Sequence, residues 1–445
     1  MSNKCWKLKA SRLADRTRNY IREVVEDLDL EPNPDKPLIS LSLGDPTVFG
    51  NLKPPIEVVE AIKESAESYR HNGYTNSIGY EEARAAVAKY SSTDNIEVKP
   101  EDVILCSGSS CALDVSISGL ADPGHNILIP HPGFPLYKTL AEGLGIKTKT
   151  YKLIPEKSWE VDLYDLESQI DDETAAIVVN NPSNPCGSVY SAQHLQDIVQ
   201  IASKNCVPII ADEIYEHMVF PGEKYYPIAG FSKDVPILSC SGLTKRFMIP
   251  GWRMGWIVIH DRNGLLGNGV RKGLCRLTQR ILGSSTLIQG AIPKILQNTP
   301  QSFYEETILL LQKHAQIMYS LLSKVDGLHP VMPQGAMYMM VRIDMARFPM
   351  FSSTLDFVKQ LMTEESIFCL PGECFNLACY MRLVLTLPED MLCEACRRIS
   401  EFCHRHYKLQ IICPSIIDEY DSRFGYVIQT GDNQRTTTRG TTNTA

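Results

Sequence analysis

Residues 207–215 read VPIIADEIY, an apolar run that ends in two acidic residues and then a tyrosine. Short apolar runs rich in β-branched residues are typical of buried strands. Asp212 is therefore predicted to stand at the carboxyl end of a strand, with Tyr215 three positions further on. Ligands of open α/β sheets bind at the carboxyl ends of the strands, so this pair marks a candidate site. The structural alternative for Asp212 is a helix N-cap.

The same arrangement recurs along residues 101–259, where short apolar runs alternate with amphipathic helical patterns. Such alternation predicts an α/β fold with a mostly parallel sheet flanked by helices. Each run is followed by a polar tract, and the tracts SGSS, HPGF, NNPSNPCG and SGLTKR are expected to converge on one crevice. The expected strands are Asp102–Leu105, Asn126–Ile129, Ala175–Val179, Val207–Ile210 and Pro236–Leu238.

The remaining patterns divide the chain into further parts. Long helical patterns from Gly269 to about Val325 precede a mixed pattern that predicts a smaller α+β domain. Prolines concentrated before residue 56 predict an irregular N-terminal arm that reaches about Ser68. The expected divisions are an arm and part of the small domain (1–75), the large domain (76–325), the C-terminal small domain (326–407) and a disordered tail (408–445).

Composition limits the classes of function. The chain has 445 residues, 44% of them hydrophobic and 22% charged, as in a soluble globular protein. A net charge of −8 disfavours nucleic-acid binding, which requires a concentrated basic surface. No apolar run has the length of a membrane span, and the N-terminal segment lacks the apolar core of a secretory signal. We expect a cytoplasmic protein, with a mitochondrial location as the weaker alternative.

The fourteen cysteines are predicted to be reduced thiols, because no secretory signal precedes them. Cys393, Cys396 and Cys403, with His404 and His406, imitate a set of metal ligands. They lie on a helical pattern whose apolar face the cysteines can join, whereas structural zinc usually binds knuckles and loops. We therefore expect no metal site.

Lys245 lies in the tract SGLTKRFMIPGWRMGW, just after a predicted strand and eight residues before Arg253. Most lysines are solvated surface charges. At the end of a strand beside other polar tracts, however, a lysine can form a Schiff base with a carbonyl cofactor.

The tracts NNPSNPCG, ADEIY, SGLTKRFMIPGWRMGW and YMRLVLT, in this order and spacing, resemble those of fold type I pyridoxal-phosphate-dependent aminotransferases. SLGDPTVFGNL, NGYTNSIGY, HPGFPLYKTLAEGLGI, LIPEKSWEVDL and PGECF are similar, more narrowly, to the tyrosine aminotransferase group. The resemblance extends from about Trp6 to Tyr407. It implies a homodimer that binds pyridoxal 5′-phosphate. It also implies transfer of the amino group of L-tyrosine, and less well of other aromatic amino acids, to a 2-oxo acid such as 2-oxoglutarate.

The resemblance also implies roles for the residues around the cofactor. Lys245 would bind it covalently and then carry a proton between substrate and cofactor. Asp212 would pair with the pyridine nitrogen and keep it protonated. Tyr215 and Asn184 would hydrogen-bond the phenolic oxygen, and Phe134 would lie on the ring.

Gly108, Ser109 and Ser110 open a predicted helix, whose free backbone N–H groups suit the cofactor phosphate. Arg253 would add a charge-assisted pair, and Tyr74 would reach this phosphate from a second subunit.

One position departs from the family. Many relatives carry a phosphate-binding serine three residues before the lysine, where this chain has Gly242. Ser241 and Thr244 are the possible substitutes, and the sequence leaves the choice open.

The substrate would bind through its α-carboxylate. Arg382, in YMRLVLT, would hold it as a bidentate fork beside Asn184, and the backbone of Gly44 would approach the same group. The structural alternative for Arg382 is a surface charge on an edge strand.

Two alternative functions stay open at this point. The same residues would serve an alanine or kynurenine aminotransferase, or a carbon–sulfur β-lyase. A cofactor-binding regulator without activity is the other alternative, although retention of Lys245, Asp212 and Arg382 disfavours it.

Overall fold

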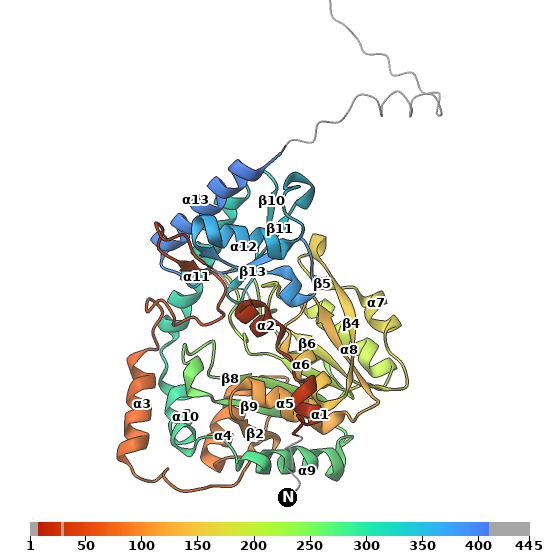
Figure 1. Ribbon diagram of the computed structural model, residues 1–445. Coiled ribbons are helices and arrows are strands. Elements are labelled where there is room, and N and C mark those ends of the chain that lie inside the picture. Colours follow the sequence, from red (N-terminus) through yellow and green to blue (C-terminus); the bar gives the residue numbers. More distant parts are fainter. Residues whose placement is uncertain (1–7, 28–30, 409–445) are drawn as a thin grey trace, which may run out of the picture. The chain divides into compact units, whose positions relative to one another are not determined.

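An eight-stranded mixed sheet lies at the centre of the protein, as seen in the computed structural model, which describes residues 8–27 and 31–408 (Figure 1). Its strand order is β2-β9-β8-β7-β6-β3-β4-β5. Neighbours from β8 to β4 run parallel, whereas β9 and β5 are antiparallel to the strands they pair with. The strands are β2 (Val103–Cys106), β3 (Asn126–His131), β4 (Lys147–Ile154), β5 (Glu160–Val161), β6 (Thr174–Asn180), β7 (Ile209–Asp212), β8 (Ile237–Gly242) and β9 (Gly255–His260).

This sheet confirms the predicted α/β fold, and every run that was expected to be a strand contributes one. The largest shift is at the end of β8, which continues to Gly242 and not only to Leu238. β7 begins at Ile209 and not at Val207. Pro208 has no N–H for a sheet hydrogen bond, and the ladder starts with the following residue, whose N–H donates to Pro236 O.

Helices cover both faces of the sheet, which explains why its central strands β6 and β7 are almost continuously apolar. In β3, Ile127 and Ile129 face one core and Leu128 faces the other. The first face is covered by α5 (Ser109–Leu120), α6 (Leu136–Leu144) and α9 (Gly267–Thr278). The second is covered by α3 (Ile56–Glu67), α4 (Glu81–Ser91), α7 (Leu163–Ser168), α8 (Ala192–Lys204) and α10 (Thr286–Asn298).

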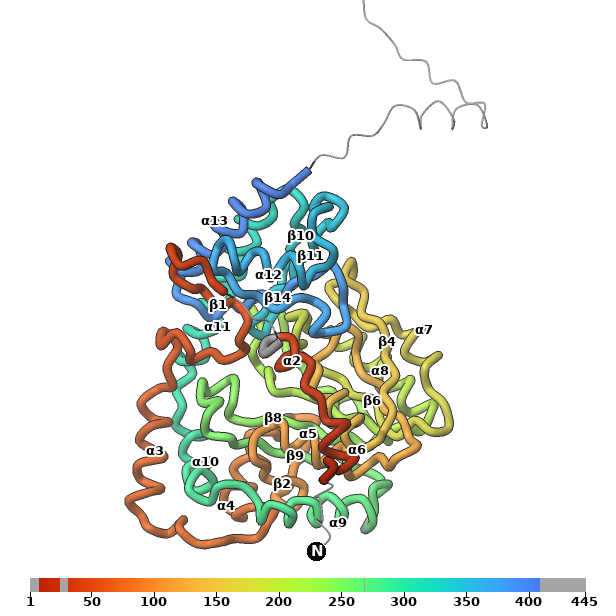
Figure 2. Tube along the Cα trace, in the orientation of Figure 1, coloured from red at the N-terminus to blue at the C-terminus, as the bar shows by residue number. Residues whose placement is uncertain are grey.

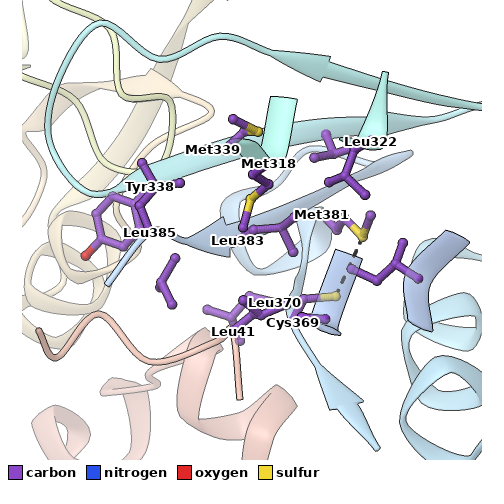
Figure 3. Packing of buried hydrophobic residues seen from close by; sticks show 14 of the residues in the cluster. Leu41, Met318, Leu322, Tyr338, Met339, Cys369, Leu370, Met381, Leu383 and Leu385 are labelled. Atoms are coloured by element: carbon purple, nitrogen blue, oxygen red, sulfur yellow. Dashed lines mark hydrogen bonds between the residues drawn. The ribbon is translucent and has the colours of Figure 1, made fainter. Parts of the chain in front are cut away.

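A second, antiparallel sheet is built from residues 328–384, with the order β10-β11-β14-β13. Its apolar core is the cluster in Figure 3, where Met339, Met381 and Leu383 of the strands pack against Met318. The elements are α11 (Gln301–Leu322), β10 (Leu328–Val331), β11 (Tyr338–Ile343), α12 (Thr354–Glu365), β13 (Leu370–Pro371), β14 (Tyr380–Val384) and α13 (Glu389–His406).

The N-terminal segment joins this second sheet region. β1 (Ile39–Ser40) pairs in parallel with β12 (Ile367–Phe368), and Figure 2 shows the red trace at β1 beside the blue C-terminal part. Further upstream are two short helices, α1 (Arg12–Arg16) and α2 (Tyr20–Asp27). The pairing places the loop after β1 next to β14, because Val384 N donates to Leu41 O.

The expectation of an irregular arm up to Ser68 was wrong for its last part, where α3 forms and packs against α10. The prolines end at Pro55, the N-cap of α3, a position where a missing N–H does no harm to the helix. The predicted tail lies outside the described residues apart from Lys408. None of the helices within 8–27 and 31–408 is both long and apolar enough to cross a bilayer.

The cysteines that imitate metal ligands lie on α13. Cys396 and Cys403 are buried in the apolar cluster of the second sheet, and Cys393 is exposed. Burial raises the pKa of Cys396 to about 12, so its thiol stays protonated at neutral pH. Such a thiol is a packing residue and a poor metal ligand.

Candidate active site

Asp212 ends β7 with its side chain buried. The hydroxyl of Tyr137 donates to its Oδ2 at 2.6 Å, and Ile214 N donates to Oδ1 at 3.3 Å. Burial raises the pKa of Asp212 to about 6, although these hydrogen bonds and the charge of Lys245 oppose the rise. Residues 214–217 form a turn, so Asp212 is not the N-cap of a helix. A buried carboxylate that forms no ion pair within the described part of the chain is well suited to a cationic partner.

Lys245 follows β8, the parallel neighbour of β7. Its Nζ donates to the carbonyl oxygen of Gly44 and lies 5.8 Å from the centroid of the Tyr215 ring. The same ammonium group acts electrostatically on Asp212. The structure therefore brings together the lysine, the carboxylate and the tyrosine that the sequence placed at strand ends.

Arg382 lies on β14 and is 2% exposed, which excludes a surface charge. Its Nη1 donates to Asn184 Oδ1 at 2.9 Å and its Nη2 to Ser42 O at 2.6 Å. Both partners are neutral, and burial lowers the pKa of the guanidinium from its usual value. Its Nε has no hydrogen-bond partner among the described residues. A desolvated guanidinium with a free donor is suited to a carboxylate from outside the chain.

The start of α5 has the features of an anion site. Gly108 has φ +81°, and a Cβ there would lie 2.5 Å from Nη2 of Arg253, so glycine lets the guanidinium approach the helix terminus. The Ser109 hydroxyl is buried and has no partner among the described residues. Ser110 is exposed in the same turn. Free N–H groups, an unpaired hydroxyl and a cation together fit a phosphate dianion.

The structure shows why position 242 has no serine, and it limits which neighbouring hydroxyl can bind the phosphate in its place. A Cβ there would lie 2.6 Å from Met254 O and 2.7 Å from the Cα of Gly255, so a serine has no room. Ser241 donates to Glu216 Oε1 at 2.6 Å and is already engaged. Of the two substitutes left open, Thr244 is half-buried, and no hydrogen bond of its hydroxyl is seen among the described residues.

The two remaining aromatic residues differ in placement. Phe134 packs edge-on against Tyr137, with ring centroids 5.9 Å apart, and Tyr137 is the residue that donates to Asp212. Phe134 is therefore linked to the Asp212 carboxylate through Tyr137, which contacts both residues. Tyr74 is 90% exposed, and its predicted role in a second subunit stays a prediction.

Sequence reasoning missed several contributors to this site. Tyr137 and Tyr338 lie in apolar stretches where a tyrosine is ordinarily a core residue. Ser42 contributes only its backbone carbonyl, which any residue provides. Phe375 has its ring centroid 4.9 Å from the Arg382 guanidinium carbon. Like Tyr137 and Ser42, it lies in one of the quoted family tracts, PGECF, and that membership was the available signal.

Comparisons with known proteins identify the family of this chain. The family model for aminotransferase class I and II matches residues 36–399. Tyrosine aminotransferase of Mus musculus is 53% identical over 90% of this chain and 88% of its own length. The Dictyostelium discoideum tyrosine aminotransferase is 45% identical over 92% of this chain and 99% of its length. The solved tyrosine aminotransferase of Leishmania infantum superposes with a TM-score of 0.87 at 35% identity, covering 91% of this chain and 100% of that one. With most of its length matched by that family model, the chain belongs to the class I and II aminotransferases.

Proposed function

We propose that this aminotransferase moves the amino group of L-tyrosine, and less efficiently of other aromatic amino acids, to 2-oxoglutarate. The products are 4-hydroxyphenylpyruvate and L-glutamate, and pyridoxal 5′-phosphate is the cofactor. The observation that carries the proposal is the meeting of Lys245, Asp212 and Arg382 around one site. The similarity to tyrosine aminotransferases supports the choice of substrate.

The residues present fit this cofactor. Ser109 and Arg253 would hold the phosphate, since they combine an unpaired hydroxyl with positive charge, and Gly108 leaves room for the Arg253 guanidinium beside the helix terminus. Asp212 would pair with the protonated ring nitrogen, and Lys245 would bind the carbonyl carbon. When bound, pyridoxal phosphate supplies an electron sink for the negative charge that develops at the substrate Cα.

The chain then has three tasks. Arg382 binds the α-carboxylate of the amino acid through its fork, and its burial keeps water from that contact. Lys245 would remove the proton from the substrate Cα as a base and deliver it, as an acid, to the carbonyl-derived carbon of the cofactor. Asp212, held by Tyr137, would keep positive charge on the ring nitrogen. The oxo product leaves before 2-oxoglutarate enters, which gives ping-pong kinetics.

The proposal includes a homodimer. Tyr74 is 90% exposed, and we assign its hydroxyl to the phosphate site of the partner subunit. Sedimentation equilibrium of the protein loaded with pyridoxal phosphate tests this part. A monomer at micromolar concentration would overturn it.

A panel of amino donors with 2-oxoglutarate tests the substrate assignment. Each half-reaction is followed by the absorbance of the cofactor, and the products by chromatography. We expect the highest kcat/KM for L-tyrosine, and no turnover by Lys245→Ala. A preference for alanine or kynurenine, release of a thiol from cysteine conjugates, or binding without amino transfer would each overturn it in favour of one alternative.

A further inference from the structure

Tyr338 is a buried tyrosine to which neither the sequence nor the proposed mechanism gives a role. It begins β11 and is 1% exposed. Figure 3 shows its hydroxyl directed away from Met318 and Met339 of the apolar cluster. The ring thus belongs to the core, whereas its polar atom lies outside it.

That polar atom contacts Tyr215. The two hydroxyl oxygens are 2.6 Å apart, and the rings meet edge to face at 80° with centroids 5.8 Å apart. Only one of the two hydroxyls donates in this pair. If Tyr338 donates, the proton of Tyr215 is free to be donated to a third group.

The same ring contacts two more residues of the site. The guanidinium carbon of Arg382 lies 4.3 Å from its centroid, a cation–π distance. A Cβ added to Gly44 would overlap its hydroxyl oxygen. Tyr338 therefore lies against the residues predicted to bind the phenolic oxygen of the cofactor and the carboxylate of the substrate.

We propose that Tyr338 is a positioning residue with two separable functions. Its hydroxyl donates to the oxygen of Tyr215 and so directs the Tyr215 proton to the phenolic oxygen of the cofactor. Its ring seats the Arg382 fork that receives the substrate carboxylate. The proposal rests on the cofactor assignment given above.

The surroundings keep the Tyr215 hydroxyl protonated. Asp212 from β7, Arg382 from β14 and Lys245 are the charged groups around the hydroxyl pair. Burial raises the pKa of Tyr215 well above its usual value, so its hydroxyl keeps the proton it is to donate. A hydroxyl that accepts one hydrogen bond becomes a stronger donor in the next, because chains of hydrogen bonds polarise one another.

The hydroxyl function is tested by the pH titration of the absorbance of bound pyridoxal phosphate in Tyr338→Phe. Donation to the phenolic oxygen stabilises its charged form, so weaker donation raises the midpoint. We expect a rise in Tyr338→Phe, smaller than in Tyr215→Phe. Tyr151→Phe is the matched control, because it also removes a buried hydroxyl, which donates to the backbone oxygen of Val178 at 2.7 Å.

An unchanged midpoint in Tyr338→Phe, with a shifted one in Tyr215→Phe, would overturn the proposal. If the parent protein did not bind pyridoxal phosphate at all, the cofactor assignment would fail instead.

A second test uses the contact with Gly44 and needs no cofactor. In the parent protein, Gly44→Ala places its methyl group on the Tyr338 hydroxyl; in Tyr338→Phe the nearest remaining ring atom lies at 3.4 Å. We expect Gly44→Ala to lower the melting temperature of the ligand-free parent by several degrees and that of Tyr338→Phe much less. Equal losses in both backgrounds would overturn the placement of the hydroxyl.

The ring function is tested with a substrate analogue that lacks the amino group, 3-(4-hydroxyphenyl)propionate. Tyr338→Phe keeps the aromatic face below Arg382, and Tyr338→Leu removes it. We expect the dissociation constant of the analogue to stay within about 2-fold in the first variant and to rise about 10-fold in the second. An equal effect of both would overturn the ring function.

Discussion

Asn184 and Arg382 connect the two sheets of the protein through the 2.9 Å hydrogen bond from Nη1 to Oδ1. Asn184 belongs to the tract after β6, whereas Arg382 belongs to β14. The bond engages one N–H of Nη1 and Ser42 O engages one of Nη2, so Nε and the second N–H of each Nη are left to a ligand. The site for the substrate carboxylate is therefore defined by both sheets together.

Replacing Arg382 by lysine tests this geometry. A lysine keeps the charge but cannot donate to Asn184, to Ser42 and to a carboxylate from one rigid plane. We expect kcat/KM for L-tyrosine to fall by about 100-fold, because each hydrogen bond to a charged group is worth about 1.5–3 kcal/mol. Steady-state kinetics measure the loss, with Arg342→Lys on the exposed side of β11 as control. A fall of less than 3-fold would contradict the fork.

Ser109→Ala is predicted to leave the stability of the protein unchanged or higher while it weakens cofactor binding. The Ser109 hydroxyl is buried and has no partner among the described residues, so removing it relieves a desolvation cost of about 1 kcal/mol. We expect urea denaturation of the ligand-free variant to give equal or higher stability, and its affinity for pyridoxal phosphate to fall about 10-fold. Ser118→Ala, at the other end of α5, serves as control. Unchanged affinity would remove Ser109 from the phosphate site.

We predict that Asp212→Asn increases the free energy of unfolding, and that the increase depends on pH. An acid whose folded pKa is about 6, above its usual 3.8, destabilises the fold as pH rises through this interval. We expect the ligand-free variant to be more stable than the parent, with the gap growing by about 1 kcal/mol between pH 5 and pH 8. Denaturant titrations at both pH values measure it. A gap that shrinks with pH would contradict the assigned shift, and activity should be lost in either case.

Gly242→Ser tests whether the family serine can be restored. The added side chain meets the backbone at Met254 and Gly255, which cannot move without distorting β9. We expect a loss of about 1–3 kcal/mol in stability and no gain in affinity for pyridoxal phosphate. Gly251→Ser is the control, since a Cβ at Gly251 meets nothing within 4 Å. Tighter cofactor binding by Gly242→Ser would show that the backbone yields.

Local patterns were sufficient to predict the sheet and much of the site. Asp212, Lys245 and Asn184 follow apolar runs, and the carboxyl ends of parallel strands share one edge. Tyr338 was not predictable, because a tyrosine in an apolar strand is usually a packing residue. The pairing of Ile39 with Ile367 was not predictable either, because no local pattern links segments so distant. The contact between Arg382 and Ser42 was not predictable for a similar reason: Arg382 donates to the backbone carbonyl of Ser42, and the identity of the side chain gives no indication of that.

The pairing of β1 with β12 has a consequence for biosynthesis. Ser42 and Arg382, whose contact completes the carboxylate site, are 340 positions apart. A ribosome has therefore released every strand of the large sheet before the partner of the N-terminal loop is made. The early segment must stay unpaired through most of translation, exposed to wrong partners such as a neighbouring nascent chain. Truncation between β9 and β14 leaves every strand of the large sheet, with Lys245 and Asp212, but removes Arg382, which binds the carboxylate of the amino acid.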